Sequence, residues 1–174
     1  MIRRATEQDF PAVAAIYERI HDKEESCAGC TGWLRGIYPT QATARLAVEL
    51  GDLFVLEEDD IILAAARINQ EQCEEYEHCP WLHHAPPEQI MVIHTLVVDP
   101  EVAPKGTGTA FVRFYEEYAH AHHCPVLRLD TNERNLPARS LYRKLGYREA
   151  GVVPTTFNGI PGVQLVCLEK VLSP

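Results

Sequence analysis

Apolar residues recur along this chain at two spacings, one typical of helices and the other of strands. A spacing of three or four positions marks an amphipathic helix, whose apolar face packs on a core. Thr6 is expected to cap the first such helix, and Gly51 is expected to end the second. The helices are expected after Thr6, over residues 40–50, after Gly106 and over residues 135–145.

Shorter apolar runs are typical of strands. The run at residues 90–98 is nearly continuously apolar, so we expect it to lie at the centre of a sheet. Residues 53–57 and 61–68 are expected to pair as a hairpin that turns at residues 58–60. Residues 154–162 are expected to form a loop between the last two strands. The remaining strands are expected at residues 2–4, 125–130, 147–153 and 163–168.

Length and charge limit the classes of function. The 174 residues have the length of one domain, so residues 1–174 are interpreted as a single α/β (α+β) domain. No apolar run is long enough to span a bilayer, and the first residues lack the apolar core of a signal peptide. A net charge of −9 argues against nucleic acid or an anionic membrane as partner and is compatible with a cationic substrate. We therefore expect a cytoplasmic protein.

Six cysteines raise the question of a metal or redox site. Cys27 and Cys30 form a CxxC pair, and Cys73 and Cys79 follow with five residues between them. A structural zinc site needs a second pair of ligands at regular spacing, which this arrangement lacks. Reduced, unlinked thiols and no bound metal are therefore expected, and a metal or redox module built on Cys27 and Cys30 stays open as an alternative.

A glycine-containing turn follows the expected central strand. Lys105-Gly106-Thr107-Gly108-Thr109 opens a helix, and the free N–H groups and positive end of a helix bind anions such as a diphosphate. The segment does not fit the phosphate-binding pattern GxxxxGK[ST], and Phe111 stands where the dinucleotide fingerprint needs glycine or alanine. A different class of phosphate ligand is therefore indicated.

A second motif lies about thirty residues further on. Residues 135–147 read N-L-P-A-R-S-L-Y-R-K-L-G-Y. Together with the glycine turn, this segment resembles the GNAT superfamily of acyl-CoA-dependent N-acyltransferases, and the two motifs cover about residues 90–147. The resemblance implies an acyl-CoA N-acyltransferase fold, with a central mixed, mostly antiparallel sheet flanked by helices. It also implies acetyl-CoA as the cofactor.

The resemblance implies where acetyl-CoA binds. The pantetheine arm is expected along the backbone of Leu96, Val97 and Val98. The diphosphate is expected on the amides of Lys105, Gly106, Thr107, Gly108 and Thr109. Asn135 is expected to cap its helix and to hydrogen-bond CoA as well. The sequence departs from the family pattern at Ala103 and Pro104, where a polar side chain and a glycine are usual, so one phosphate contact is expected to be missing.

Two residues are candidates for proton transfer. Tyr142 keeps its proton at neutral pH and is expected to protonate the departing thiolate, the alternative being a tyrosine of the core. His94 stands where many family members have glutamate and is expected to act as the general base. The alternative for His94 is a buried, hydrogen-bonded histidine.

The acceptor is the least determined part of the site. Trp33, Tyr38, Trp81 and Phe157 lie in segments that are expected to be irregular and, by the resemblance, to line an acceptor pocket. The function expected is N-acetyl transfer to the primary amine of a small-molecule or amino-acid-like acceptor, by direct attack in a ternary complex. A catalytically silent CoA-binding sensor of the same fold is the alternative, motivated by Ala103, Pro104 and His94. Homodimers are common in the family, and nothing in the sequence favours or excludes one.

Overall fold

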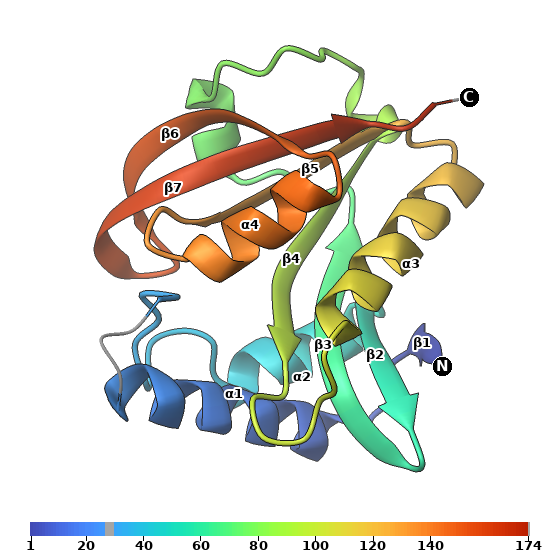
Figure 1. Ribbon diagram of the computed structural model, residues 1–174, viewed down its shortest axis with the longest axis vertical. Helices are drawn as coiled ribbons and strands as arrows, with labels where there is room; N and C mark the ends of the chain where they lie inside the picture. The colour runs from blue at the N-terminus through green and yellow to red at the C-terminus, as the bar shows by residue number, and fades with distance from the viewer. Residues whose placement is uncertain (27–29, 174) are drawn as a thin grey trace.

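The strand expected at the centre, β4 (Ile90–Val98), does lie in the middle of a seven-stranded sheet. The structure is a computed structural model that describes residues 1–26 and 30–173. The strand order is β1-β2-β3-β4-β5-β7-β6, and neighbours are antiparallel except β4 and β5 (Figure 1). The other strands are β1 (Ile2–Arg4), β2 (Leu53–Glu58), β3 (Ile61–Asn69), β5 (Val126–Asn132), β6 (Arg148–Phe157) and β7 (Ile160–Val171). This mixed α/β architecture is the fold class expected from the sequence.

Helices cover both faces of the sheet, because alternate side chains of each strand point to opposite faces. Met91 and Ile93 belong to the core cluster of α3 (Thr107–Ala121) and α4 (Leu136–Lys144). On the opposite face, Val97 packs with α1 (Phe10–Ser26) and α2 (Gln41–Glu49). Two 3₁₀ turns, η1 (Glu74–His78) and η2 (Pro87–Gln89), lie in the connection from β3 to β4. No helix in the described parts of the chain has the length and apolar character needed to cross a membrane.

A β-bulge interrupts β4 and separates it from β5. Ala65 pairs with Val97 while Arg67 pairs with His94, so β4 contributes one more residue than β3 over this stretch. Thr95, inside the bulge, has a φ of 50°, which is rare for a β-branched residue. The parallel pairing with β5 ends at Val92, and the two strands diverge beyond it.

The expectation for the first helix was wrong in its starting point. The helix begins at Phe10, four positions after Thr6, and residues 7–9 form a turn. The carboxylate of Asp9 accepts hydrogen bonds from the Thr6 N–H and hydroxyl and from Arg3. These contacts hold the chain in a turn, so Thr6 does not cap the helix.

The expectation of a loop over residues 154–162 was also wrong. Strand β6 continues to Phe157 and β7 starts at Ile160, which leaves Asn158 and Gly159 as a two-residue turn. Both have positive φ, 50° and 78°, as the hairpin turn with the correct twist requires, and Asn-Gly is its strongest signal. Pro154 is tolerated because β6 lies at the edge of the sheet.

Candidate active site

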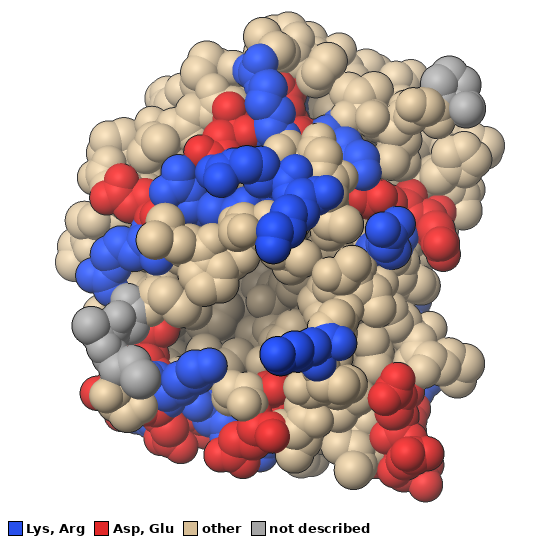
Figure 2. Space-filling view, in the orientation of Figure 1, with Lys and Arg blue, Asp and Glu red and all other residues tan. Residues whose placement is uncertain are grey.

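A cavity of about 900 Å³ opens where β4 and β5 diverge. Its walls come from β4 beyond Val92, the end of β5, one face of α4 and the segment between α1 and α2. The turn that joins β6 to β7 borders it. Figure 2 shows a hollow in this face of the molecule, with Lys and Arg side chains on its rim. Segments that are far apart in the sequence therefore meet around one space that is large enough for a sizeable ligand.

The loop between β4 and α3 adjoins this cavity, and its Pro100 and the first turn of α3 at Gly108 belong to the lining. Gly106 precedes α3 with a φ of 97°, which glycine adopts freely, and no side chain caps the helix. The amide and hydroxyl of Thr107 both donate to the Pro104 carbonyl, so they are already occupied. The amides without an acceptor among the described residues are those of Lys105, Gly106, Gly108 and Thr109.

Most of the residues expected to bind CoA line the cavity or adjoin it. Asn135 caps α4, as expected, and its side-chain oxygen accepts from the Ala138 N–H at 3.3 Å. A Cβ atom at Gly108 would lie 3.4 Å from Leu141, an ordinary van der Waals contact, so α3 passes close to α4 at this point. Lys105, Gly106, Thr107 and Thr109 form the adjoining loop and the first turn of α3. The lining includes Leu96, Val97, Val98, Gly108, Asn135 and Tyr142.

Tyr142 is buried in α4 and borders the cavity. Its ring packs edge-on against Tyr147 with 5.8 Å between ring centroids. Its hydroxyl has no hydrogen-bond partner among the described residues. Burial, with the negative charge of Asp130, holds the pKa of Tyr142 well above its usual range. The hydroxyl therefore keeps its proton at neutral pH and is free to donate it into the cavity.

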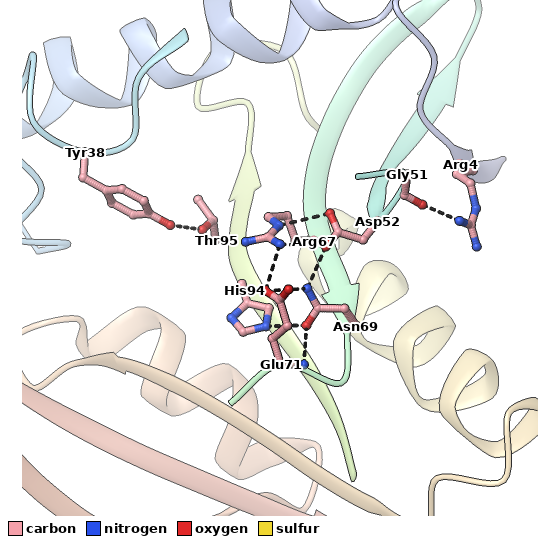
Figure 3. A network of polar contacts seen from close by, with 9 residues as sticks. All are labelled: Arg4, Tyr38, Gly51, Asp52, Arg67, Asn69, Glu71, His94 and Thr95. Carbon is pink, nitrogen blue, oxygen red and sulfur yellow. Dashed lines mark hydrogen bonds and ion pairs between the residues drawn. The ribbon is translucent and has the colours of Figure 1, made fainter. Parts of the chain in front are cut away.

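His94 belongs to a polar network that runs between β3 and β4 (Figure 3). Its Nε2 lies 2.8 Å from the Oδ1 atom of Asn69, whose amide nitrogen donates to Asp52 at 2.7 Å. Because Oδ1 can only accept, Nε2 carries the hydrogen and Nδ1 is left as the acceptor in the neutral ring. Burial and the charge of Arg67 lower the pKa of His94 to about 4. His94 is therefore neutral at pH 7.

Three of the four aromatic residues expected in the acceptor pocket line the cavity. Tyr38 and Trp33 pack edge to face at 6.0 Å, and the Tyr38 hydroxyl hydrogen-bonds the Thr95 hydroxyl (Figure 3). Phe157 is at the end of β6 rather than in an irregular segment. Trp81 lies apart from the cavity: it is 7% exposed, and the Arg128 guanidinium stacks on it at 4.2 Å.

Arg67 and Asp130 are among the charged residues of the cavity that were not singled out from the sequence. Arg67 donates to Asp52 through two nitrogens, at 3.0 and 2.7 Å, and to Glu71. Asp130 accepts a hydrogen bond of 2.8 Å from the Tyr76 hydroxyl, and burial raises its pKa to about 6. The available signal for Asp130 was an acidic residue near the end of an apolar strand, but the sequence does not show that this strand leaves its parallel neighbour there.

The structure describes only one cysteine of the CxxC pair that was considered as a metal or redox site. Cys27 lies outside the described residues, while Cys30 is exposed and borders the cavity. The five cysteines that the structure describes are free thiols. No cluster of three or more His, Cys, Asp or Glu suited to a metal ion occurs within residues 1–26 and 30–173.

Comparison with known proteins gives one family. Residues 14–147 match the model of the acetyltransferase (GNAT) family. An uncharacterized N-acetyltransferase of Methanocaldococcus jannaschii is 31% identical over 75 residues, which are 43% of this chain. The matched segment spans 33% of that relative's length.

Solved structures share the fold over the whole chain. An acetyltransferase of the GNAT family from Streptococcus agalactiae superposes with a TM-score of 0.84 at 21% identity, covering 100% of this chain and 96% of the other. The structure of yncA from Salmonella typhimurium, solved with its cofactor acetyl-CoA, has a TM-score of 0.68 at 18% identity. Its match covers 100% of this chain and 94% of that chain. At sequence identities of 21% and 18%, the structural similarity shows a shared fold alone.

Proposed function

Because the chain belongs to the acetyltransferase (GNAT) family, we propose that it transfers an acetyl group from acetyl-CoA to a primary amine by direct attack in a ternary complex. The acceptor class proposed is a small-molecule or amino-acid-like amine. One observation carries the proposal: β4 and β5 diverge at a bulge and open a cavity beside the unpaired amides of α3.

The cavity fits acetyl-CoA by its hydrogen-bonding capacity. Beyond Val92, the edge of β4 that faces β5 has lost its partner strand, and buried backbone groups need partners. Leu96, Val97 and Val98 lie on this stretch and can pair with the amides of a pantetheine arm. The free amides at the start of α3 suit a diphosphate, and Asn135 lines the same cavity. When bound, acetyl-CoA supplies an acyl thioester.

The residues of the chain then have separate tasks. Tyr142 gives its proton to the sulfur that leaves, a role supported by its position in the cavity lining and its raised pKa. His94 presents Nδ1 as a hydrogen-bond acceptor toward the acceptor amine or a water molecule. Trp33, Tyr38 and Phe157 supply apolar walls for the acceptor, whereas Trp81 packs away from it.

The test combines calorimetry with a thiol-release assay over a panel of primary amines. We expect acetyl-CoA to bind and at least one amine to release thiol. Absence of acetyl-CoA binding would contradict the proposal. Tight binding of acetyl-CoA with no thiol release for any amine, and no measurable effect of Tyr142→Phe, would favour a CoA-binding sensor of the same fold.

A further inference from the structure

Asp130 places a carboxylate in the cavity without a cation beside it. It is the fifth residue of β5 and lies beyond the last residue that pairs with β4, so its side chain borders the space that the bulge creates. One hydrogen bond is present, from the Tyr76 hydroxyl to Oδ2 at 2.8 Å. No lysine, arginine or histidine of the described residues forms an ion pair with Asp130. A partly buried carboxylate in this state lacks the partner that usually offsets its desolvation.

The groups that interact with Asp130 are neutral or acidic, while Lys23 and Arg67 line the same cavity without an ion pair to it. Burial raises its pKa, the Tyr76 hydrogen bond opposes that shift, and the charge of Glu75 adds to it. The negative charge of Asp130 in turn raises the pKa values of the hydroxyls and thiols around it, Tyr142 among them. The titratable and charged groups around it are Tyr38, Cys73, Glu75, Tyr76, Tyr142 and Cys167.

His94 has the opposite electrostatic setting. Burial lowers the pKa of its ring, the positive charge of Arg67 lowers it further, and the negative charge of Asp52 opposes the shift. Arg67 pairs with Asp52 and Glu71, so the carboxylates near His94 already have a cation partner, whereas an ammonium ion brought to Asp130 would meet a carboxylate that has none. Asp130 is also the stronger base of the two, with a pKa near 6 against about 4. Both groups border the same cavity, so the acceptor can reach either.

We propose that Asp130 is the residue that binds the acceptor's ammonium group and takes its proton as the general base. The inference rests on the proposed acyl transfer and names the substrate class of the same cavity: an amine that arrives as a cation. His94 then serves as a hydrogen-bond acceptor beside it.

The step balances in protons and bonds. Asp130 takes one proton from the ammonium ion, which frees the nitrogen lone pair. A bond forms between this nitrogen and the carbonyl carbon, and the carbon–sulfur bond of the thioester breaks. Tyr142 gives its proton to the sulfur and recovers one from the nitrogen as the amide forms. Asp130 releases its proton to water, so one proton leaves per turnover.

The test compares Asp130→Asn with wild type in the thiol-release assay, using propylamine and 2-phenylethylamine within a panel of primary amines. Asparagine keeps the shape and can still accept from Tyr76, but it loses the charge and the basicity. We expect kcat/KM for the amine to fall about 100-fold or more, since a general base contributes at least that much. The fall of kcat/KM below about pH 6 should disappear in the variant. Acetyl-CoA affinity should stay within about twofold of wild type, because the nucleotide end of the site is unchanged.

Two further variants make the result decisive. Glu117→Gln makes the same charge change on the exposed side of α3, outside the cavity, and should match wild type. Tyr76→Phe keeps the carboxylate but removes its hydrogen bond, so the acid limb of kcat/KM should move to higher pH. If Asp130→Asn does not fold, Tyr76→Phe alone decides the question. A fall of kcat/KM at the same pH in Tyr76→Phe as in wild type would contradict the inference.

The outcomes separate this inference from the proposed function. If Asp130→Asn has the same kcat/KM as wild type and the same fall at low pH, the role of Asp130 is overturned while the proposed function stands. Failure of the wild type to bind acetyl-CoA, or to release thiol with any amine, overturns the proposed function and this inference with it.

Discussion

The carboxylate of Asp99 accepts a 2.6 Å hydrogen bond from the guanidinium of Arg19, which connects α1 to the loop before α3. Asp99 also accepts from the backbone N–H groups of Glu101 and Val102. Its side chain is 1% exposed, so the ion pair is nearly enclosed on that side. The pair therefore holds the turn from which the free amides of α3 emerge.

Replacing Arg19 with methionine should destabilise the protein and weaken its hold on acetyl-CoA. The substitution leaves a buried carboxylate without its cation, which costs about 3 kcal/mol in comparable pairs. Chemical denaturation measures the loss of unfolding free energy, and calorimetry measures acetyl-CoA affinity. Arg19→Lys is the matched control and should recover most of both. Full stability of Arg19→Met would show that the pair does not hold the loop.

Tyr142→Phe should lower turnover while leaving acetyl-CoA affinity nearly unchanged. The hydroxyl borders the cavity, has no internal partner and keeps its proton, so its removal subtracts a proton donor without opening a void. A loss of about 100-fold in kcat is expected for a missing general acid. Steady-state thiol release measures this loss. Tyr147→Phe is the control, because this neighbouring buried hydroxyl lies outside the cavity lining and should be dispensable. A fully active Tyr142→Phe would remove Tyr142 as the acid.

Gly106→Ala should lower the affinity for acetyl-CoA while it changes the stability of the fold only slightly. The residue has a φ of 97°, so a side chain either strains the backbone or turns the amides of the loop away. Gly36→Ala provides a matched control, since Gly36 has a φ of 76° and, like Gly106, has open space around a built Cβ. We expect similar small losses of stability in both variants and a loss of acetyl-CoA affinity in Gly106→Ala alone. Calorimetry and thermal unfolding distinguish the two. Equal acetyl-CoA affinities would contradict a role for this loop in phosphate binding.

Local signals explain which parts of the fold were predictable. The cap at Asn135, the glycine at Gly106 and the apolar run of β4 each act within a few residues, so sequence alone located them. The C-terminal hairpin was missed although Asn158 and Gly159 carry a strong turn signal. Proline is disfavoured inside a sheet, and only the position of β6 at the sheet edge makes Pro154 compatible with a strand.

The site depends on relationships that no local pattern encodes. The bulge puts Thr95 at positive φ, although threonine is a poor residue for that conformation, so nothing in the sequence marks it. The place of Asp130 in the cavity follows from the divergence of two strands that lie about thirty residues apart in the chain. Trp81 and Phe157 both looked like loop aromatics, and only tertiary packing separates the buried one from the one that lines the cavity.

Asp130→Asn should make the protein more stable at neutral and alkaline pH while it removes activity. The folded-state pKa of Asp130 is raised from 3.8 to about 6, so the folded protein holds this proton more tightly than the unfolded chain does. The contribution of protonated Asp130 to the unfolding free energy is fully present below pH 3.8. It is lost as the pH rises through 6. Asparagine stays neutral and avoids the loss. A gain of about 2 kcal/mol at pH 8 is expected, after allowance for water in the cavity.

Urea denaturation of wild type and Asp130→Asn at several pH values measures this gain. The difference in unfolding free energy should be near zero at pH 3.5 and should grow between pH 4 and 7, because only the wild-type carboxyl group ionises in that interval. Glu117→Gln, an exposed change of the same charge, should show no such trend. A less stable Asp130→Asn at pH 8 would mean that the carboxylate strengthens the fold through Tyr76. A more stable one would mean that the fold keeps a destabilising charge in the cavity, as a residue kept for binding a cation requires.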